Sequence, residues 1–277
     1  MNEIIIGTWN VSECVSTQWD VRTGITVDPS EEAILACLSE IVRLINETGV
    51  DVLCLQEFPI TQNGSDRIAA YIREHTALCH YHGIDTYPSF LMKNGQIGIC
   101  IFSKYPLTQC DYHPFVNPGI TKLSRSGKLY WSFDKGLITA HITHRDQCFT
   151  LVTGHAVSFS PFDARAEDYP ESFREIENRA KALVGKNEPV VIIGDFNTEN
   201  LFSILPTLGD YVSDRLPGAT TIPGLMEGEV FDGGRKLDYC LVTPDVTVTK
   251  TEKIPNFSDH FLCLCHCRLS EEVSDVL

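Results

Sequence analysis

The chain has 277 residues, of which 43% are hydrophobic, and its formal net charge at pH 7 is −15. A composition this apolar can bury a substantial core and excludes an intrinsically disordered chain. The acidic balance argues against a non-specific nuclease, because the averaged surface potential repels a polyphosphate backbone unless a local basic patch overrides it.

Targeting signals and disulfides are not evident in the sequence. Residues 1–7 lack a basic segment and their apolar run is too short for a signal peptide. No apolar run approaches the length of a membrane span. The eleven cysteines are spread along the chain, and several lie inside apolar runs such as 52–55, which is typical of reduced structural thiols. We therefore expect a cytoplasmic protein.

Neither an internal repeat nor a Pro/Gly/Ser-rich linker divides the chain. Its length is compatible with two small domains or with one large domain built around a pair of sheets. Without a visible boundary, we prefer one domain over residues 1–270, followed by a short C-terminal tail at 271–277.

The first part of the chain alternates strands with a helix. Residues 4–6, 50–55 and 97–102 are short, mostly continuous apolar runs, as expected of strands covered on both faces. Between the first two runs, Ser30 can cap a helix that stops at Gly49. Its apolar stripe is formed by Ile34, Leu35, Leu38, Ile41, Val42 and Ile45.

The middle of the chain predicts an antiparallel hairpin. Residues 136–144 and 148–153 read as two strands, and the polar residues 145–147 form the short turn between them. The sheet is therefore mixed.

A second helix and two further strands follow the hairpin. The helix is predicted from about Pro170 to Gly185. Residues 190–193 form another apolar strand, and residues 261–269 form the last one. The inward face of the helix is predicted to carry Phe173, Ile176, Ala180, Leu183 and Val184.

Polar residues that can support chemistry lie next to these strands. Ligand sites favour the C-terminal ends of such strands, so the residues can converge on one rim. They are Asn10 after the first strand, Gln56 and Glu57 after the second, His155 after the hairpin, Asp195 to Asn197 after the fourth apolar run, and Ser258 to His260 before the last strand.

Six short motifs in this order resemble those of the endonuclease/exonuclease/phosphatase superfamily, whose fold is DNase-I-like. Each motif is weak alone, but all six in order make a specific pattern that spans residues 4–269. They are Thr8-Trp9-Asn10, Leu55-Gln56-Glu57, Gly154-His155, Gly194-Asp195-Phe196-Asn197, Lys236-Leu237-Asp238-Tyr239 and Ser258-Asp259-His260. The resemblance implies a single-domain, four-layer α/β sandwich of two sheets with helices on both outer faces.

The resemblance also implies a metal-assisted phosphoesterase. The negative charge of a phosphate ester repels a nucleophilic water, so a site must neutralise the phosphoryl oxygens while it activates water. Glu57 and Asn10 supply hard oxygen ligands of the kind that suits Mg²⁺, and Asp259 is a second carboxylate on the metal side. Mn²⁺ is an alternative, and the number of metals stays open.

The remaining motif residues receive catalytic roles by the same resemblance. Asp195 would orient or deprotonate the attacking water, and Asn197 would hydrogen-bond a phosphate oxygen. His260 would contact the phosphate or shuttle a proton, while Asp238 holds its tautomer. His155 matches the position of a histidine that can serve as the leaving-group acid.

Structural interpretations stand beside the functional ones. Asp195 could form only an Asx turn, Asp259 could cap a turn, and His155 could hydrogen-bond within the core. On the last strand, Cys263, Cys265 and Cys267 share one face but are spaced too far apart for one zinc ion, so we interpret them as small core residues. We assign no role to the cluster of His75, His80 and His82.

Specificity is expected to depend on three long loops, at 11–29, 104–134 and 156–169. In the first, Trp19 and Arg22 could contact a substrate. The second carries a basic and aromatic group, Lys122, Arg125, Lys128, Tyr130 and Trp131, that could hold phosphates or stack on a base or equally be an ordinary solvated loop.

The third loop carries Phe159, Pro161 and Phe162, which could line an apolar pocket or grip a lipid, although packing is the more usual explanation. Lys236 and Arg125 are the candidate substrate-binding residues.

The predicted function is a magnesium-dependent phosphoesterase acting on a phosphomonoester or phosphodiester of a small molecule or lipid-linked group. The net charge favours this over the alternative, a nuclease or nucleic-acid end-processing enzyme, which would need a basic groove beside the site. A binding module without chemistry is a third alternative, disfavoured because every expected catalytic position holds a competent residue type.

Overall fold

The computed structural model describes residues 3–14, 31–60, 67–89, 95–123, 127, 129–186, 188–223 and 233–270. Trp19, Arg22, Arg125, Lys128 and the predicted tail 271–277 lie outside the described residues.

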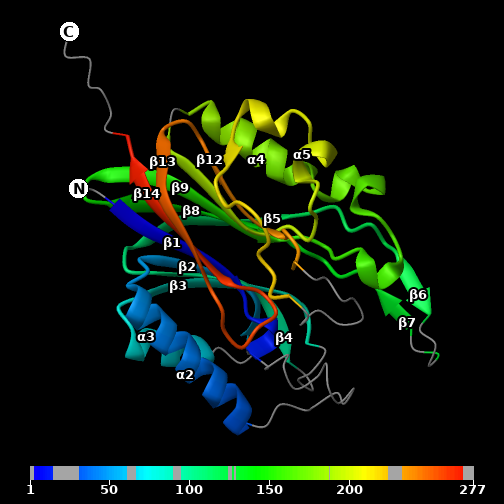
Figure 1. Cartoon of the computed structure of the whole chain (residues 1–277), viewed down its shortest axis with the longest axis horizontal. Coiled ribbons are helices and arrows are strands. Elements are labelled where there is room, and N and C mark those ends of the chain that lie inside the picture. Colours follow the sequence, from blue (N-terminus) through cyan, green and yellow to red (C-terminus); the bar gives the residue numbers. More distant parts are fainter. Residues whose placement is uncertain are drawn as a thin grey trace.

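Two six-stranded mixed sheets form the centre of the fold, as predicted (Figure 1). The first sheet has the order β13-β14-β1-β2-β4-β3. Its central strands β1 and β2 are parallel, with Asn10 opposite Gln56. Their C-terminal ends therefore lie side by side. The strand bounds are β1 Glu3–Asn10, β2 Val52–Ile60, β3 His80–Pro88, β4 Gln96–Ser103, β13 Val246–Ile254 and β14 Leu262–Leu269.

The second sheet has the order β11-β12-β10-β9-β8-β5. β9 and β10 are parallel, so Asp195 lies opposite His155. On the other side of β10, antiparallel β12 places Asp238 opposite the same aspartate. The strand bounds are β5 Leu107–Pro114, β8 Gly136–His144, β9 Gln147–His155, β10 Val190–Asp195, β11 Ser213–Asp214 and β12 Asp238–Val242.

Helices cover the outer faces of both sheets (Figure 1). α2 (Glu31–Thr48) and α3 (Arg67–His75) lie on the first sheet, and α4 (Arg174–Val184) and α5 (Leu201–Ile204) lie on the second. In α2, three apolar side chains at helical spacing, Leu38, Ile41 and Ile45, are buried against the sheet. Leu35 was expected in this stripe but is 47% exposed. The arrangement is the predicted four-layer sandwich.

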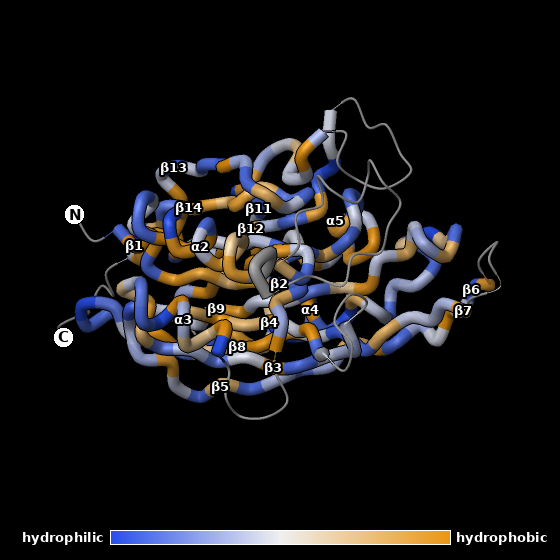
Figure 2. Tube along the Cα trace, turned by 90° about the horizontal axis from the view of Figure 1, so that it is seen from below, coloured by the Kyte–Doolittle hydropathy of each residue, from blue (hydrophilic) through white to orange (hydrophobic). Residues whose placement is uncertain are grey.

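The faces of the two sheets that meet each other bury a continuous apolar core. Figure 2 shows the corresponding hydrophobic stretches along the central strands. Cys263, Cys265 and Cys267 lie in this core with no exposed surface, which agrees with their interpretation as small core residues. The described part of the chain contains no helix that is both long and apolar enough to cross a membrane.

The segments predicted as loops contain more structure than expected. Residues 104–134 include β5 and a small hairpin of β6 (Thr121–Leu123) and β7 (Leu129–Trp131). β5 is an edge strand with half-buried and exposed positions and a register shift, so it lacks the apolar run of a central strand. Residues 156–169 hold the 3₁₀ turns η2 (Ser160–Phe162) and η3 (Ala166–Asp168).

Three further 3₁₀ turns complete the described structure. η1 (Ser12–Cys14) follows β1, and η5 (Leu208–Asp210) precedes β11. The helix expected from Pro170 begins at Arg174 instead, because η4 (Pro170–Ser172) occupies its first turn.

Candidate active site

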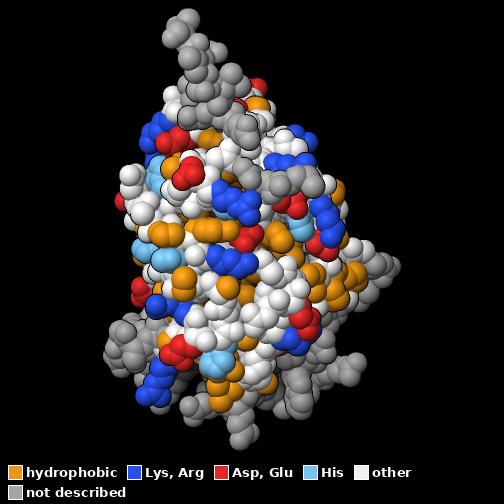
Figure 3. Space-filling model, turned by 90° about the vertical axis from the view of Figure 1, so that its left-hand side faces the viewer, with side chains coloured by type: hydrophobic (Ala, Val, Ile, Leu, Met, Phe, Trp, Pro, Cys, Tyr) orange, Lys and Arg blue, Asp and Glu red, His pale blue; other side chains and the backbone are white. Residues whose placement is uncertain are grey.

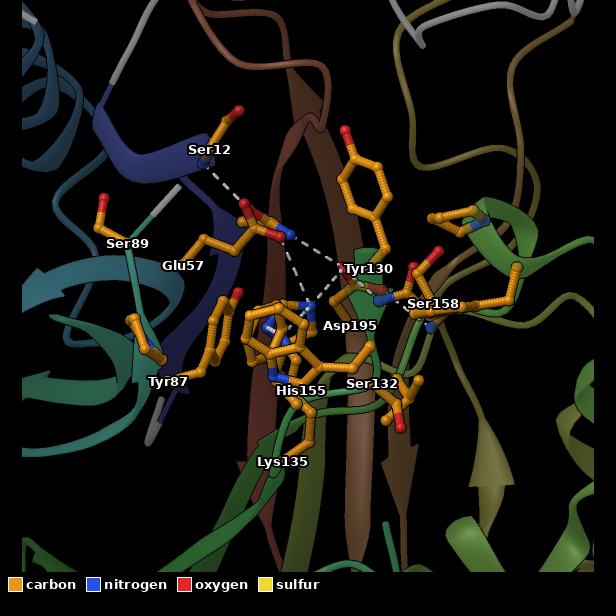
Figure 4. A pocket seen from close by; sticks show the side chains of 18 of the residues that line it. Ser12, Glu57, Tyr87, Ser89, Tyr130, Ser132, Lys135, His155, Ser158 and Asp195 are labelled. Atoms are coloured by element: carbon orange, nitrogen blue, oxygen red, sulfur yellow. Dashed lines mark hydrogen bonds and ion pairs between the residues drawn. The ribbon is translucent and has the colours of Figure 1, made fainter. Parts of the chain in front are cut away.

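A pocket of about 420 Å³ opens where the C-terminal ends of β1, β2, β9 and β10 meet (Figure 4). The sequence-predicted residues that line it are Asn10, Glu57, His155, Asp195, Asn197, Asp259 and His260. They come from both sheets and from the turn before β14. The two parallel strand pairs therefore bring residues that lie up to 250 positions apart to one rim, as the position of the motifs predicted.

Asp195 lies at the centre of this group. One carboxylate oxygen, Oδ1, accepts the backbone N–H of Asn197 at 2.9 Å, which is the Asx turn considered as its structural role. The other oxygen, Oδ2, accepts Asn10 Nδ2 at 3.0 Å and lies 3.6 Å from His155 Nε2 and 3.8 Å from His260 Nε2. The turn thus positions the carboxylate and leaves Oδ2 directed at the site.

Burial raises the pKa of Asp195 to about 6, although the neighbouring His260 charge lowers it. A carboxylate with such a pKa is a stronger base than an exposed aspartate and is still ionised near neutral pH.

His260 is paired with Asp238. Its Nδ1 lies 2.8 Å from Asp238 Oδ2, and both side chains are buried. Burial alone would lower the pKa of His260, but the charges of Asp238 and Asp195 outweigh it and hold that pKa well above its usual value. The ring is therefore a cation whose Nε2–H faces Asp195.

His155 has a different partner, Lys135, which sequence reasoning missed. The Lys135 ammonium lies 3.0 Å from His155 Nδ1 and 3.8 Å above the centre of the Tyr87 ring. Burial lowers the pKa of Lys135 to about 7, although Glu57 and Asp195 raise it. Burial, Lys135 and His260 together lower the pKa of His155 well below its usual value, so this ring is neutral.

The predicted hairpin already indicates that Lys135 lies near His155. β8 pairs with β9 so that Gly136 lies opposite His155. The residue that enters β8, Lys135, is consequently a neighbour of the last residue of β9.

Glu57 has an unusual backbone conformation that directs it into the pocket, and hydrogen bonds hold Asn10 beside it at the end of β1. Glu57 has a φ of 51° at a register shift between Leu55 and Phe58, and its side chain is 29% exposed. Asn10 Oδ1 accepts the backbone N–H of Ser12 at 3.0 Å, and the Ser258 hydroxyl donates to the Asn10 carbonyl at 2.7 Å. This last bond ties the Asp259 turn to the end of β1.

The oxygen donors on this side fit Mg²⁺. Two carboxylates, Glu57 and Asp259, and the amide of Asn10 line one pocket. Burial raises the pKa of Glu57, and the charges of Asp259 and Asp195 raise it further despite Lys135, so the carboxylates repel one another. A divalent cation would relieve that repulsion. No three His, Cys, Asp or Glu side chains of the described residues form a metal cluster, and Mg²⁺ is commonly held by one or two carboxylates and several waters.

The two predicted substrate-binding residues do not join this group. The Lys236 ammonium lies 3.0 Å from Asp214 Oδ2 and donates to the Asp238 carbonyl at 2.6 Å, and Lys236 does not line the pocket. These two contacts hold the Lys236 ammonium against β11 and β12. Arg125 lies outside the described residues.

Several loop residues considered from the sequence do line the pocket. Tyr130 and Trp131 from β7 contribute to it, as do Pro161 and Phe162 from η2. Phe159 is buried instead and stacks on Tyr169 at a centroid distance of 5.0 Å, so its role is packing.

Comparison with known proteins agrees with the sequence motifs. A family model described as the Endonuclease/Exonuclease/phosphatase family matches residues 7–260. Comparison with curated proteins gives no match.

Solved structures match over almost the whole chain. An endonuclease/exonuclease/phosphatase family protein from Leptotrichia buccalis C-1013-b has a TM-score of 0.65 and 16% identity, covering 96% of this chain and 100% of that chain. A protein of the same description from Bacteroides vulgatus has a TM-score of 0.63 and 18% identity, covering 98% and 100%. A mannosyl-6-phosphatase from Bacteroides thetaiotaomicron VPI-5482 has a TM-score of 0.57 and 15% identity, covering 96% and 100%. Similarity at this level of identity establishes the shared fold.

Proposed function

The chain belongs to the endonuclease/exonuclease/phosphatase family, and on this premise we propose that it is a magnesium-dependent phosphoesterase. Its substrate is a phosphomonoester or phosphodiester of a small molecule or a lipid-linked group. The observation that carries the proposal is the buried Asp195 carboxylate, whose Oδ2 faces a neutral His155 on one side and a cationic His260 on the other.

The metal would be held by Glu57, Asp259 and Asn10, which line one side of the pocket. Mg²⁺, or Mn²⁺ in its place, would neutralise the phosphoryl oxygens and stabilise the charge that develops during hydrolysis.

Asp195 is the proposed base. Asn10 and the Asn197 backbone hold the carboxylate in one orientation, so its ionised Oδ2 can accept a proton from an attacking water. A pKa of about 6 suits this task near neutral pH.

His260 is the proposed phosphate-binding cation. Asp238 accepts a hydrogen bond from Nδ1–H and stabilises the ring cation, which carries its second proton on Nε2, facing Asp195. Asn197 lines the same pocket and is the proposed neutral donor for a second phosphate oxygen: its Nδ2 donates one hydrogen to the Ala156 carbonyl at 3.1 Å, and its longer 3.4 Å contact with Asp195 would be exchanged for the phosphate.

His155 and Lys135 together are the proposed source of the leaving-group proton. Nε2–H of His155 faces the site, and Nδ1 accepts from the Lys135 ammonium. When Nε2 gives its proton to the leaving oxygen, Lys135 can return one to Nδ1, so the ring stays neutral throughout.

Extended nucleic acid is not the proposed substrate. The net charge of −15 repels it, and Lys135 is the one lysine or arginine among the described residues that line the pocket. At the end of the molecule opposite the β6–β7 hairpin, basic side chains are scattered among acidic ones (Figure 3). The proposed compartment is the cytoplasm, which suits eleven free cysteines, eight of them buried.

The deciding experiment measures hydrolysis of phosphomonoesters, phosphodiesters, phospholipids, DNA and RNA by the purified protein with Mg²⁺, Mn²⁺ or EDTA. We expect turnover of small or lipid-linked esters that EDTA abolishes and that Asp195→Ala reduces by at least about 10³-fold. The exposed Asp146→Asn variant is the control and should keep full activity. Preference for DNA or RNA would replace the proposal with the nuclease alternative, and metal-independent turnover would refute the magnesium requirement.

A further inference from the structure

One wall of the pocket is a continuous aromatic surface that runs from the solvent to the reaction centre. Trp131 packs on Phe133 with ring centres 5.6 Å apart, and Phe133 stacks on Tyr87 at 4.9 Å. The Tyr87 ring lies 6.5 Å from the His155 ring and directly below the Lys135 ammonium. We call Tyr87, Phe133 and Trp131 the aromatic wall. It ends beside the groups proposed to protonate the leaving oxygen (Figure 4).

Most of the exposed large hydrophobic side chains lie at the outer end of this wall or in the segment that leads to it. Six large hydrophobic side chains are exposed in the described part of the chain, and five of them lie between residues 116 and 131. Leu129 and Trp131, both of which line the pocket, are each 51% exposed. Within the hairpin, Leu123 lies opposite Leu129, so the same face continues beyond the pocket. Apolar surface that is concentrated at the mouth of a site indicates that a ligand covers it.

Three serine hydroxyls near the wall already take part in hydrogen bonds. Ser132 donates to Asn117 Oδ1 at 2.6 Å, Ser89 donates to Glu13, and Ser158 pairs with Ser160. A polyol such as a sugar needs partners for several hydroxyls in place of water. Ser132 and Ser89 have used their only donors and can offer a sugar hydroxyl just an acceptor, whereas an apolar group needs no partner.

Cationic side chains are also scarce along the wall. Lys135 lies at its inner end, beside His155. Lys122 on β6 pairs with Asp163 at 2.7 Å. A row of phosphates would meet no series of free cations among these described residues, while a single phosphate at the inner end would meet Lys135 and His260.

Resting on the proposed phosphoesterase function, we infer that the substrate is a phosphate ester of an apolar alcohol. Its phosphate lies among Asp195, His155 and His260, and its alkyl or aryl group lies along the aromatic wall towards Leu129 and Trp131. Such a group can belong to a dissolved ester or to a lipid in an aggregate. The two sources share the chemistry that the wall recognises.

The test is a series of alkyl phosphates from ethyl to octyl, as monoesters and as methyl diesters below their micelle-forming concentrations, against a hexose phosphate of similar size. We expect kcat/KM to rise roughly fourfold for each added methylene until the wall is covered. The hexose phosphate should react no faster than the ethyl ester. Equal rates along the series, or preference for the hexose, would overturn the inference while leaving the phosphoesterase intact.

Variants of the aromatic wall test whether the wall causes the dependence of kcat/KM on chain length. Trp131→Ser and Phe133→Ser should flatten the dependence on chain length, and Leu35→Ser, which removes an exposed apolar side chain from α2, should leave it unchanged. An unaltered dependence in both wall variants would also overturn the inference. The long-chain ester embedded in zwitterionic vesicles identifies the source: faster cleavage there than in solution assigns the wall to a lipid, and slower cleavage assigns it to a dissolved ester.

Failure of the proposed function gives a different result, namely no hydrolysis of any ester. Calorimetric binding of octyl phosphate and the hexose phosphate then decides the inference without turnover. Tighter binding of octyl phosphate that is lost in Trp131→Ser supports it, and equal binding of the two overturns it.

Discussion

The Lys135 ammonium lies 3.0 Å from Nδ1 of His155, in the interior of a pocket that otherwise carries three carboxylates. While Lys135 is protonated it has only donors, so Nδ1 of the ring accepts and the ring proton is on Nε2. That nitrogen lies 3.6 Å from Asp195 and 3.7 Å from Glu57. Lys135 thereby determines which ring nitrogen of His155 carries the proton.

The first prediction concerns the leaving group. Lys135→Met should slow hydrolysis of an alkyl phosphate by about 10²-fold or more, because the alkoxide needs a proton to leave. A 4-nitrophenyl ester needs little protonation and should lose less than about tenfold. Steady-state kinetics on the matched pair measures the difference. Lys250→Met, on the exposed edge strand β13, is the control; equal losses on both esters would refute the proton-supplying role.

The second prediction concerns the stability cost of the same lysine. The folded-state pKa of Lys135 is about 7, and its ordinary value is 10.5. Between these two pH values the unfolded chain binds more protons than the folded protein. The free energy of unfolding therefore increases, and the destabilising effect of Lys135 decreases, as pH rises through this window. Urea denaturation at pH 7, 8 and 9 measures the free energy of unfolding of both proteins. Relative to that of Lys135→Met, the value for the native protein should increase by up to about 1.4 kcal/mol per pH unit. Parallel curves for the two proteins would mean that the lysine stays charged when buried.

The third prediction separates the two histidines. Asp238→Asn removes the negative partner of His260, and kcat/KM should fall by about 10³-fold. The pKa of His260 lies above its ordinary value in the native protein, so its cation persists until pH rises through that raised pKa. Without the Asp238 charge the pKa falls, and the high-pH limb of the activity profile should move to lower pH. Asp146→Asn is again the control. If the high-pH limb of Asp238→Asn stays where it is in the native protein, the limb reports the titration of a group other than His260.

The sequence predicted the central part of the fold because central strands carry a visible signal. β4 and β10 are buried along nearly their whole length, so their apolar runs stand out. The edge strands β5 and β13 consist mostly of half-buried and exposed positions, so neither carries the apolar run that predicts a strand. The strand ends could be foreseen for the same reason, and with them the convergence of Asn10 and Asp195.

The rest of the site depends on packing between segments that are distant in sequence. Tyr87 belongs to β3 and Phe133 follows β7, and only the folded chain stacks these two rings on each other. Lys236 shows the reverse: it adjoins a motif residue, yet Asp214 from β11 draws its ammonium away from the pocket. The local sequence pattern can place a residue near a strand end, but it does not determine with which neighbour the charged side chain forms an ion pair.

The final prediction concerns the metal. Burial and the charges of Asp259 and Asp195 raise the pKa of Glu57, so in the metal-free protein these carboxylates destabilise one another. Added Mg²⁺ should therefore raise the melting temperature at pH 7.5, in proportion to RT ln(1 + [Mg²⁺]/Kd). Glu57→Gln removes one ligand charge and should weaken Mg²⁺ binding by about tenfold or more in calorimetry, while raising the melting temperature measured in EDTA. Glu74→Gln, which changes an exposed carboxylate on α3, should alter neither quantity. If Glu57→Gln binds Mg²⁺ as tightly as the native protein, Glu57 is not a ligand.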